Sequence, residues 1–96
     1  MSDPEFHRED GPSKGRWFTE IDGALAEMTY SRASPTLIII NHTEVADALR
    51  GKGLARALVG EAVAAARAEG FTIIPLCPIA KAILEKTPEW GDVLKR

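Results

Sequence analysis

The chain has 96 residues, of which 45% are hydrophobic and 27% charged, and its formal net charge is −2. This length predicts one domain, and the absence of a dense run of Lys or Arg argues against nucleic acid or an anionic membrane as a partner. A single cysteine, Cys77, excludes an internal disulfide and favours a reducing cytoplasm, and no apolar stretch reaches the length of a membrane span.

The first half of the chain predicts strands. Residues 1–15 are polar and interrupted by proline and glycine, so we expect a flexible segment, part of which (Glu5–Arg8) could form an edge strand. Strand-like runs follow at 17–21 and 24–30, joined by Asp22-Gly23, a strong two-residue hairpin signal. We expect the next turn over residues 31–35.

The second half predicts a strand–helix–strand unit. Four large aliphatic residues open the run 37–45, which indicates a central strand buried on both faces. Apolar residues at helical spacing predict a helix over 53–69 that Gly70 ends. A β-rich run at 71–76 and a helix over 78–86, stopped by Pro88, complete the unit. The last two strands should therefore be parallel, and the apolar tail that contains Trp90, Val93 and Leu94 should dock on the domain.

The sequence from Val45 to Ala55 has the features of a phosphate site. Two glycines, Gly51 and Gly53, flank Lys52 where the long helix begins. The first turn of a helix has N–H groups without partners, which a phosphate can accept, and glycines remove the Cβ atoms that would block its approach. Nearby positive charges come from Arg50, Lys52 and Arg56. Glycine pairs before a helix are more often simple turns, and the spacing matches neither GxxxxGK[ST] nor GxGxxG.

These residues also resemble a known family. Arg50-x-x-Gly53-x-Ala55 is similar to the R/Q-x-x-G-x-G/A signature of the GNAT superfamily of N-acetyltransferases. Three further segments, His42-Thr43-Glu44-Val45, Leu49-Arg50-Gly51-x-Gly53 and Pro75-Leu76-Cys77-Pro78, resemble its small single-domain subfamily. The resemblance covers roughly residues 16–94, so we interpret 16–96 as a minimal acetyl-CoA-binding domain.

The resemblance implies a fold and a cosubstrate. The fold is α+β, with some three-layer α/β character: a mixed, mostly antiparallel twisted sheet with a splayed parallel strand pair and two helices. The pantetheine arm of acetyl-CoA would enter the split between residues 37–45 and 71–76, and the Val45 N–H would polarise the thioester carbonyl. Pro75 fits a strand whose ladder has come apart. The residues expected to bind the cosubstrate are Thr43, Val45, Arg50, Gly51, Lys52, Gly53, Leu54, Ala55, Arg56 and Cys77.

Three residues are candidates for catalysis. Glu44 and His42 share one parity along their strand, and each could take the proton from an attacking amine, while Thr43 points to the other face. The alternatives are a salt bridge for Glu44 and a structural hydrogen bond for His42. Cys77 begins a helix, where a thiol has a lowered pKa. It could contact the acetyl or thiol end of acetyl-CoA and accept the acyl group transiently, or be a small buried hydrophobe.

The sequence departs from the family in two ways. Helix 78–86 contains no tyrosine to protonate the leaving thiolate; Ile83 and Thr87 stand where the subfamily commonly has tyrosine and histidine. Asp22-Gly23 also leaves no room for the helices that normally build the acceptor pocket. We therefore expect acetyl transfer to an amine of an unknown acceptor, such as a protein or peptide, with a non-catalytic CoA-binding sensor or carrier as the alternative. We expect no metal, a cytoplasmic location, and a monomer or a homodimer.

Overall fold

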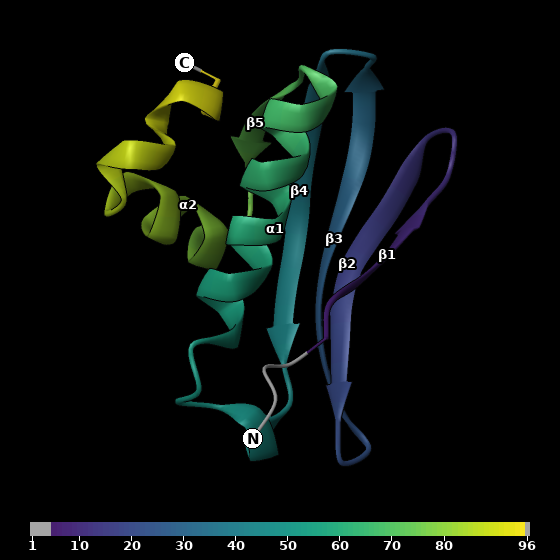
Figure 1. Cartoon of the computed structure of the whole chain (residues 1–96), viewed down its shortest axis with the longest axis vertical. Helices are drawn as coiled ribbons and strands as arrows, with labels where there is room; N and C mark the ends of the chain where they lie inside the picture. Colours follow the sequence, from purple (N-terminus) through teal and green to yellow (C-terminus); the bar gives the residue numbers. More distant parts are fainter. Residues whose placement is uncertain (1–4, 96) are drawn as a thin grey trace.

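The computed structural model describes residues 5–95 and contains one five-stranded mixed sheet in the order β1-β2-β3-β4-β5 (Figure 1). The strands are β1 (His7–Asp10), β2 (Lys14–Ile21), β3 (Ala24–Ser34), β4 (Leu37–Val45) and β5 (Thr72–Pro75). The helices are α1 (Leu54–Glu69) and α2 (Pro78–Glu85), with 3-10 segments η1 (Asp47–Leu49) and η2 (Pro88–Val93). Only the β4–β5 pairing is parallel, so the predicted mixed sheet is confirmed. No helix among residues 5–95 is long and apolar enough to cross a membrane.

The N-terminal region contains more strand than predicted. The edge strand lies at 7–10 instead of 5–8, and β2 begins at Lys14, inside the segment expected to be flexible. Residues 1–4 of that segment lie outside the described residues. The hairpin at Asp22-Gly23 is confirmed: φ is 50° at Asp22 and 80° at Gly23, as a two-residue hairpin turn requires.

β3 is also longer than predicted. It runs to Ser34, whereas the sequence places a turn over residues 31–35. Ser34 pairs with Leu37 of β4, so the turn contains only Pro35 and Thr36. The prediction was wrong because strand partners on both sides of β3 outweigh the turn preference of its polar residues.

Burial on β4 alternates, which corrects the prediction that both faces are buried. Ile38 and Ile40 are 0% exposed, whereas Leu37 and Ile39 are only half-buried. Within residues 5–95 the core lies on the Ile38 side of the sheet, where both α1 and α2 pack. The helices therefore form one layer and the sheet another. On the side of β4 that the helices do not cover, the large aliphatic residues reflect the preference of such side chains for strands.

The uncovered side of the sheet, opposite α1, is called the open face below. The register and the alternation of side chains assign Phe18, Glu27, Ile39, His42 and Glu44 to it. Because no helix lies between β2 and β3, no segment of residues 5–95 covers this face in the way α1 covers the other.

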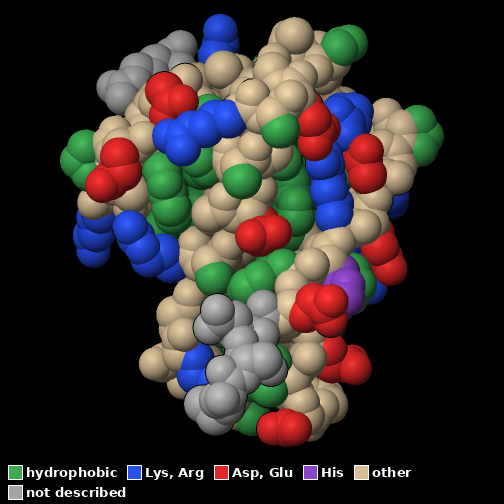
Figure 2. Space-filling model, in the orientation of Figure 1, with side chains coloured by type: hydrophobic (Ala, Val, Ile, Leu, Met, Phe, Trp, Pro, Cys, Tyr) green, Lys and Arg blue, Asp and Glu red, His purple; other side chains and the backbone are tan. Residues whose placement is uncertain are grey.

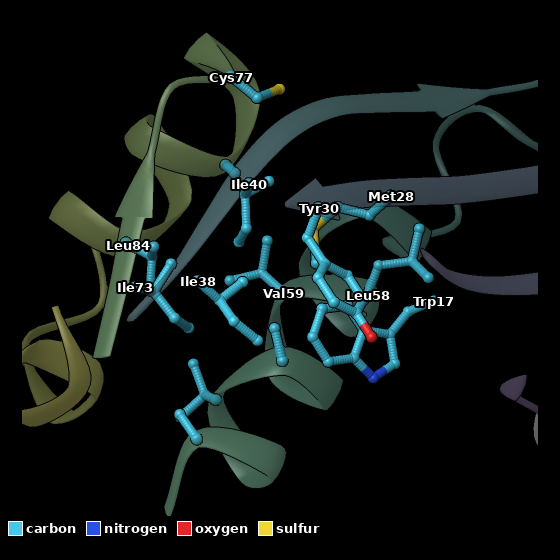
Figure 3. Packing of buried hydrophobic residues seen from close by; sticks show 14 of the residues in the cluster. Trp17, Met28, Tyr30, Ile38, Ile40, Leu58, Val59, Ile73, Cys77 and Leu84 are labelled. Carbon is cyan, nitrogen blue, oxygen red and sulfur yellow. The ribbon is translucent and has the colours of Figure 1, made fainter. Parts of the chain in front are cut away.

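The core is a single cluster between the sheet and the helices. Figure 3 shows Ile38, Ile73 and Leu84 packed together near Val59, with Cys77 at one end of the cluster beyond Ile40. Two buried alanines on α1, Ala62 and Ala66, let the helix approach the sheet closely. The predicted docking of the tail is confirmed, because Val93 is buried and Leu94 pairs with Ile73 as an isolated bridge.

Acid is expected to weaken the attachment of β1. The Asp10 carboxylate accepts hydrogen bonds from the Tyr30 hydroxyl and from Arg32. These bonds, that of Tyr30 first, lower the pKa of Asp10 below its ordinary value. Their stabilisation is complete above the unfolded-state pKa of about 3.9 and is lost as the pH falls through the lower folded-state pKa. Between about pH 5 and pH 2, the free energy of unfolding measured in urea should therefore fall less for Asp10→Asn than for wild type. An equal fall in the two proteins would contradict this.

Candidate functional site

The end of the pairing between β4 and β5 forms one wall of the candidate site. Their parallel register ends at Ile40 opposite Pro75. The N–H groups of Leu76 and Cys77 then both donate to the Ile40 carbonyl, at 3.0 and 3.2 Å, and the chain turns into α2. Residues 41–45 of β4 therefore keep one edge without a neighbouring strand.

A β-bulge at Asn41 decides which groups face this unpaired edge. Asn41 has no partner in the register between β3 and β4. Beyond the bulge, the Ala46 N–H donates to the Leu25 carbonyl of β3 at 3.0 Å. Because successive strand residues turn their backbone groups to alternate sides, Thr43 and Val45 direct theirs to the unpaired edge. Val45 is the residue whose N–H is expected to polarise a thioester carbonyl.

A cleft of about 520 Å³ lies beside this edge and reaches the start of α1. It brings together most of the site residues expected from the sequence, which are His42, Thr43, Glu44, Val45, Arg50, Gly51, Gly53, Leu54 and Ala55. Three expected residues, Lys52, Arg56 and Cys77, do not line it.

Two residues that line the cleft were missed. Leu49 comes from η1 and is 3% exposed, and Ile79 comes from the first turn of α2 and is 47% exposed. Neither was among the site residues expected from the sequence, because an apolar side chain carries no chemistry of its own. The position of Ile79 one residue after Pro78, where a helix begins beside the strand split, is the signal that could have identified it.

The turn before α1 has the geometry that only glycine adopts easily. Gly51 has a φ of 80° and Gly53 a φ of 73°, both in the left-handed region. A Cβ added to either glycine would meet no atom within 4 Å. The space above the turn is therefore open, and a ligand could come close to the backbone there.

The start of α1 offers a run of free donors. None of the N–H groups of residues 51–56 donates to a backbone or side-chain acceptor within residues 5–95; the first bond of the helix runs from Ala57 N–H to the Gly53 carbonyl, at 3.1 Å. The helix also has no capping side chain and no acidic residue in its first turn. Unpaired donors together with the positive end of the helix dipole form a binding site for an anion.

The basic residues around the turn differ in their surroundings. The Arg50 guanidinium lies 3.1 Å from Asp47 in a highly exposed ion pair, which water and salt weaken. Lys52 is exposed. The Arg56 side chain instead donates to the Thr87 hydroxyl at 2.8 Å and lies over the Trp90 ring, so its guanidinium joins α1 to the C-terminal segment. Because the Arg56 guanidinium is engaged there, only the backbone N–H of Arg56 stays free to bind a phosphate at the turn.

The two candidate bases lie together on the open face. His42 Nε2 is 3.7 Å from Glu44 Oε2, and the side chains are 65% and 72% exposed. This confirms that they share a face, with Thr43 turned toward the core. Both are accessible to a solvent-borne amine, and both border the cleft.

Cys77 is buried behind the cleft at the start of α2. Its side chain is 3% exposed, and residue 77 is the N-cap of the helix. Burial raises the pKa of the thiol, but hydrogen bonds to the thiolate from the Thr43 hydroxyl and from backbone groups of Ala80 and Ile79 outweigh burial and lower the pKa. Apart from this interaction with the thiolate, the Thr43 hydroxyl makes no hydrogen bond within residues 5–95.

The one tyrosine of the chain is far from the cleft. Tyr30 binds Asp10 and Arg8 through its hydroxyl, which Figure 3 shows at the opposite end of the core from Cys77. Thr87, which stands where the subfamily often has histidine, is 1% exposed and donates to the Ile83 carbonyl at 2.8 Å. Neither hydroxyl is placed to serve the cleft.

The described part of the surface carries charges of both signs. On the described part of the α1-bearing face, acidic and basic side chains are interspersed without a large basic patch (Figure 2). Among residues 5–95, no group of three His, Cys, Asp or Glu side chains could hold a metal ion.

Comparison with known proteins gives one family. A family model described as GCN5-related N-acetyl-transferase matches residues 16–93. The chain is similar to the NMR structure of a GCN5-like candidate N-acetyltransferase from Staphylococcus aureus, with 36% identity and a TM-score of 0.74 over 99% of this chain and 91% of that one. No curated protein matches the chain.

A second solved structure shares the fold. The chain is similar to a crystal structure of ribosomal-protein-alanine N-acetyltransferase from Brucella melitensis biovar Abortus 2308, with a TM-score of 0.66. The identity is 17%, and the match covers 79% of this chain and 62% of that one. At this identity the likeness concerns the fold alone.

Proposed function

The chain belongs to the GCN5-related N-acetyltransferase family, and we propose that it binds acetyl-CoA in the cleft beside β4 and transfers the acetyl group to an amine. Proteins of this family generally use acetyl-CoA as the acyl donor. The observation that carries the proposal is the run of unpaired N–H groups at residues 51–56, which lies beside open space and an unpaired strand edge.

The diphosphate of acetyl-CoA would bind at the start of α1. Its oxygens can accept hydrogen bonds from several N–H groups of the turn at once, and bonds of this kind to a charged acceptor are roughly twice as strong as neutral ones. Arg50 and Lys52 add positive charge at the mouth of the turn. The absence of a Cβ at Gly51 and Gly53 lets the phosphates come into contact with the backbone.

The pantetheine arm would extend along the unpaired edge of β4. An amide of the arm can pair with this free edge as a short β-strand would. The Val45 N–H would then donate to the thioester carbonyl, where negative charge develops during attack. Ile79 offers an apolar contact from the opposite side of the cleft.

The reaction needs a base on the open face. Glu44 or His42 would take a proton from the acceptor ammonium, and the free amine nitrogen would attack the carbonyl carbon. The bond from that carbon to sulfur then breaks with its electron pair on sulfur, and the nitrogen gives up its second proton to the released thiolate through water, so the products are the amide and CoA. The exposure of the open face leaves room for an acceptor amine on a protein or peptide.

Calorimetric titration with CoA and acetyl-CoA tests the binding step. We expect one binding site per chain for CoA and acetyl-CoA. An analogue that lacks the diphosphate should not bind. Release of free thiol from acetyl-CoA in the presence of a panel of primary amines tests the transfer. A chain that binds neither CoA nor acetyl-CoA would overturn the proposal.

Replacing Glu44 with glutamine is expected to slow acetyl transfer about a hundredfold, because general bases contribute roughly 10²–10⁴ to rates. The dissociation constant for acetyl-CoA should stay within about threefold of wild type, since the carboxylate would contact the acceptor. The measurement is thiol release under saturating acetyl-CoA.

Glu27→Gln provides the matched control for Glu44→Gln. Glu27 lies opposite Glu44 on the open face, but Arg16 binds its carboxylate at 3.1 Å, and it does not line the cleft. This variant should keep the wild-type rate. If Glu44→Gln is as active as wild type and His42→Gln is inactive, the base is His42.

Two roles are proposed for Cys77. As an acyl acceptor, its thiolate would attack the thioester carbon and form an acetyl-cysteine while the coenzyme thiolate leaves. As a structural residue, it only closes the core at the start of α2. Mass spectrometry after incubation with acetyl-CoA distinguishes the two, because only the first role adds an acetyl group to Cys77.

The alternative proposal is a CoA-binding module that turns over slowly or not at all. The observation that favours it is the placement of Tyr30, whose hydroxyl is bound to Asp10 on the other side of the core. Tight binding of acetyl-CoA without thiol release to any amine of the panel would support this alternative and exclude the enzyme.

A further inference from the structure

Two exposed apolar side chains lie where β5 turns into α2. Among residues 5–95, the exposed large hydrophobic side chains are Leu76, at 64%, and Ile79, at 47%. Single exposed apolar residues are ordinary on a protein surface, but Ile79 lines the candidate cleft and Leu76 does not. Ile79 is therefore an apolar wall that stays uncovered inside a ligand site, and Leu76 is a neighbour of the same kind outside it.

Ile79 lies at the end of the cleft that is distant from the glycine turn. The Cys77 N–H donates to the Ile40 carbonyl at 3.2 Å, which ties the start of α2 to β4 where the two strands part. The backbone of Ile79 and the hydroxyl of Thr43 both contact the Cys77 sulfur. Ile79 is therefore level with Thr43 along β4, two residues or about 7 Å beyond Val45.

The orientation of the bound thioester decides which part of the donor meets Ile79. With the diphosphate at the glycine turn and the carbonyl oxygen on the Val45 N–H, the sulfur lies on the turn side of Val45. The acyl chain leaves the carbonyl in the opposite direction, along the unpaired edge toward Ile79. Because a strand directs its N–H groups sideways within the sheet, the thioester lies near the plane of the sheet, and the acceptor amine attacks it from the open face. The acyl chain and the acceptor therefore use different space.

An acetyl group is too short to use this wall. Its methyl carbon lies about 1.5 Å beyond the carbonyl carbon, which leaves about 5 Å to the level of Ile79. Apolar contact needs a separation of about 4.0–4.5 Å. An acyl chain with two more carbons would close the gap, and a longer chain would pass over the half-exposed side chain toward solvent.

We propose, resting on the proposed function, that the cleft takes acyl-CoA donors whose linear acyl chain is longer than acetyl, such as butyryl, and that Ile79 binds the added carbons. The transfer step is unchanged. The amine nitrogen bonds to the carbonyl carbon, and the carbon–sulfur bond breaks with its electron pair on sulfur. One proton of the ammonium goes to the base and a second goes through water to the thiolate, so the products are the longer-chain amide and CoA.

A series of chain lengths measures the contact without turnover. The probes are acetyl, propionyl, butyryl and hexanoyl analogues of acyl-CoA in which a methylene group replaces the sulfur, so that no acyl group is transferred. Each is titrated by calorimetry beside CoA. Full burial of one methylene group corresponds to about fourfold in affinity, so contact with one wall should give about twofold. From acetyl to butyryl, the affinity of wild type should therefore rise about fourfold, and hexanoyl should add less per carbon.

Two serine substitutions form a matched pair. The ratio of the butyryl to the acetyl affinity should fall from about four in wild type to about one in Ile79→Ser. Leu76→Ser, the control outside the cleft, should keep the wild-type ratio. Taking the ratio within each variant cancels any effect on the rest of the coenzyme. Both side chains are already exposed, so neither substitution opens a cavity in the core. Ile79→Val, which keeps most of the wall, should give an intermediate ratio.

The outcomes are distinct. An affinity that does not rise from acetyl to butyryl in wild type, or that rises equally in Ile79→Ser, would overturn this inference and leave the proposed function intact. Loss of the rise in Leu76→Ser as well would also overturn it, because the added carbons would then not depend on the wall inside the cleft. A wild-type chain that binds neither CoA nor the acetyl analogue would overturn both.

Discussion

Replacement of Gly53 with glutamate should weaken the binding of CoA at least about a hundredfold, which corresponds to about 2.8 kcal/mol. The new side chain would fill the space in which the diphosphate is proposed to bind, where a Cβ meets no protein atom. Its carboxylate would also place a negative charge among the N–H groups of residues 51–56. Calorimetric titration of the folded variant with CoA measures the effect.

The opposite end of the same helix provides the matched control. Gly70 has a φ of 79°, against 73° for Gly53, and a Cβ on it also meets no atom within 4 Å. Glutamate at Gly70 should therefore cause a similar backbone strain, about 1–2 kcal/mol of stability, some 24 Å away along α1. Gly70→Glu should bind CoA as wild type does. Equal binding by both variants would show that the turn before α1 is not the phosphate site.

Sequence periodicity predicted the elements whose signal is local. The helix over 53–69, its end at Gly70 and the hairpin at Asp22-Gly23 were all predicted correctly, because a helical stripe of apolar residues and a turn with two positive φ values are properties of short segments. The extent of β3 and the one-sided burial of β4 were not, because both depend on which neighbours cover a strand. Those neighbours are set by the whole topology.

Most of the residues proposed from the sequence border one cleft, but their contacts could not all be predicted. The residues at 42–45 and, except for Lys52, those at 50–55 lie around one cleft, because the end of β4 and the start of α1 are joined by a short turn. The engagement of Arg56 with Thr87 and Trp90 could not be read from a motif, since those partners are more than 30 residues away in the chain. The missing hydrogen bond of Thr43 likewise became visible only when its surroundings were complete.

Substitution of Gly15 by alanine is expected to destabilise the chain by about 3 kcal/mol, because overpacking of a filled core costs roughly 1–3 kcal/mol and sometimes more. The added Cβ would overlap the Glu9 carbonyl oxygen and would lie 2.6 Å from Tyr30 Cζ. Tyr30 is 1% exposed and stacks against Trp17 with ring centroids 4.5 Å apart, so it has little room to move. Urea unfolding followed by tryptophan fluorescence measures the loss.

Gly60→Ala should change stability in the opposite direction. Gly60 lies within α1, and its Cβ would be 3.4 Å from the Trp90 ring, which is ordinary contact. Alanine in a helix is favoured over glycine by about 0.5–1 kcal/mol. Because alanine is not intrinsically unfavourable at Gly15 either, a loss there must come from the contact with Tyr30 and β1. In a double-mutant cycle, Tyr30→Leu should therefore reduce the cost of Gly15→Ala. Strict additivity of the two substitutions would rule out Tyr30 as its cause and leave the overlap with the Glu9 carbonyl of β1.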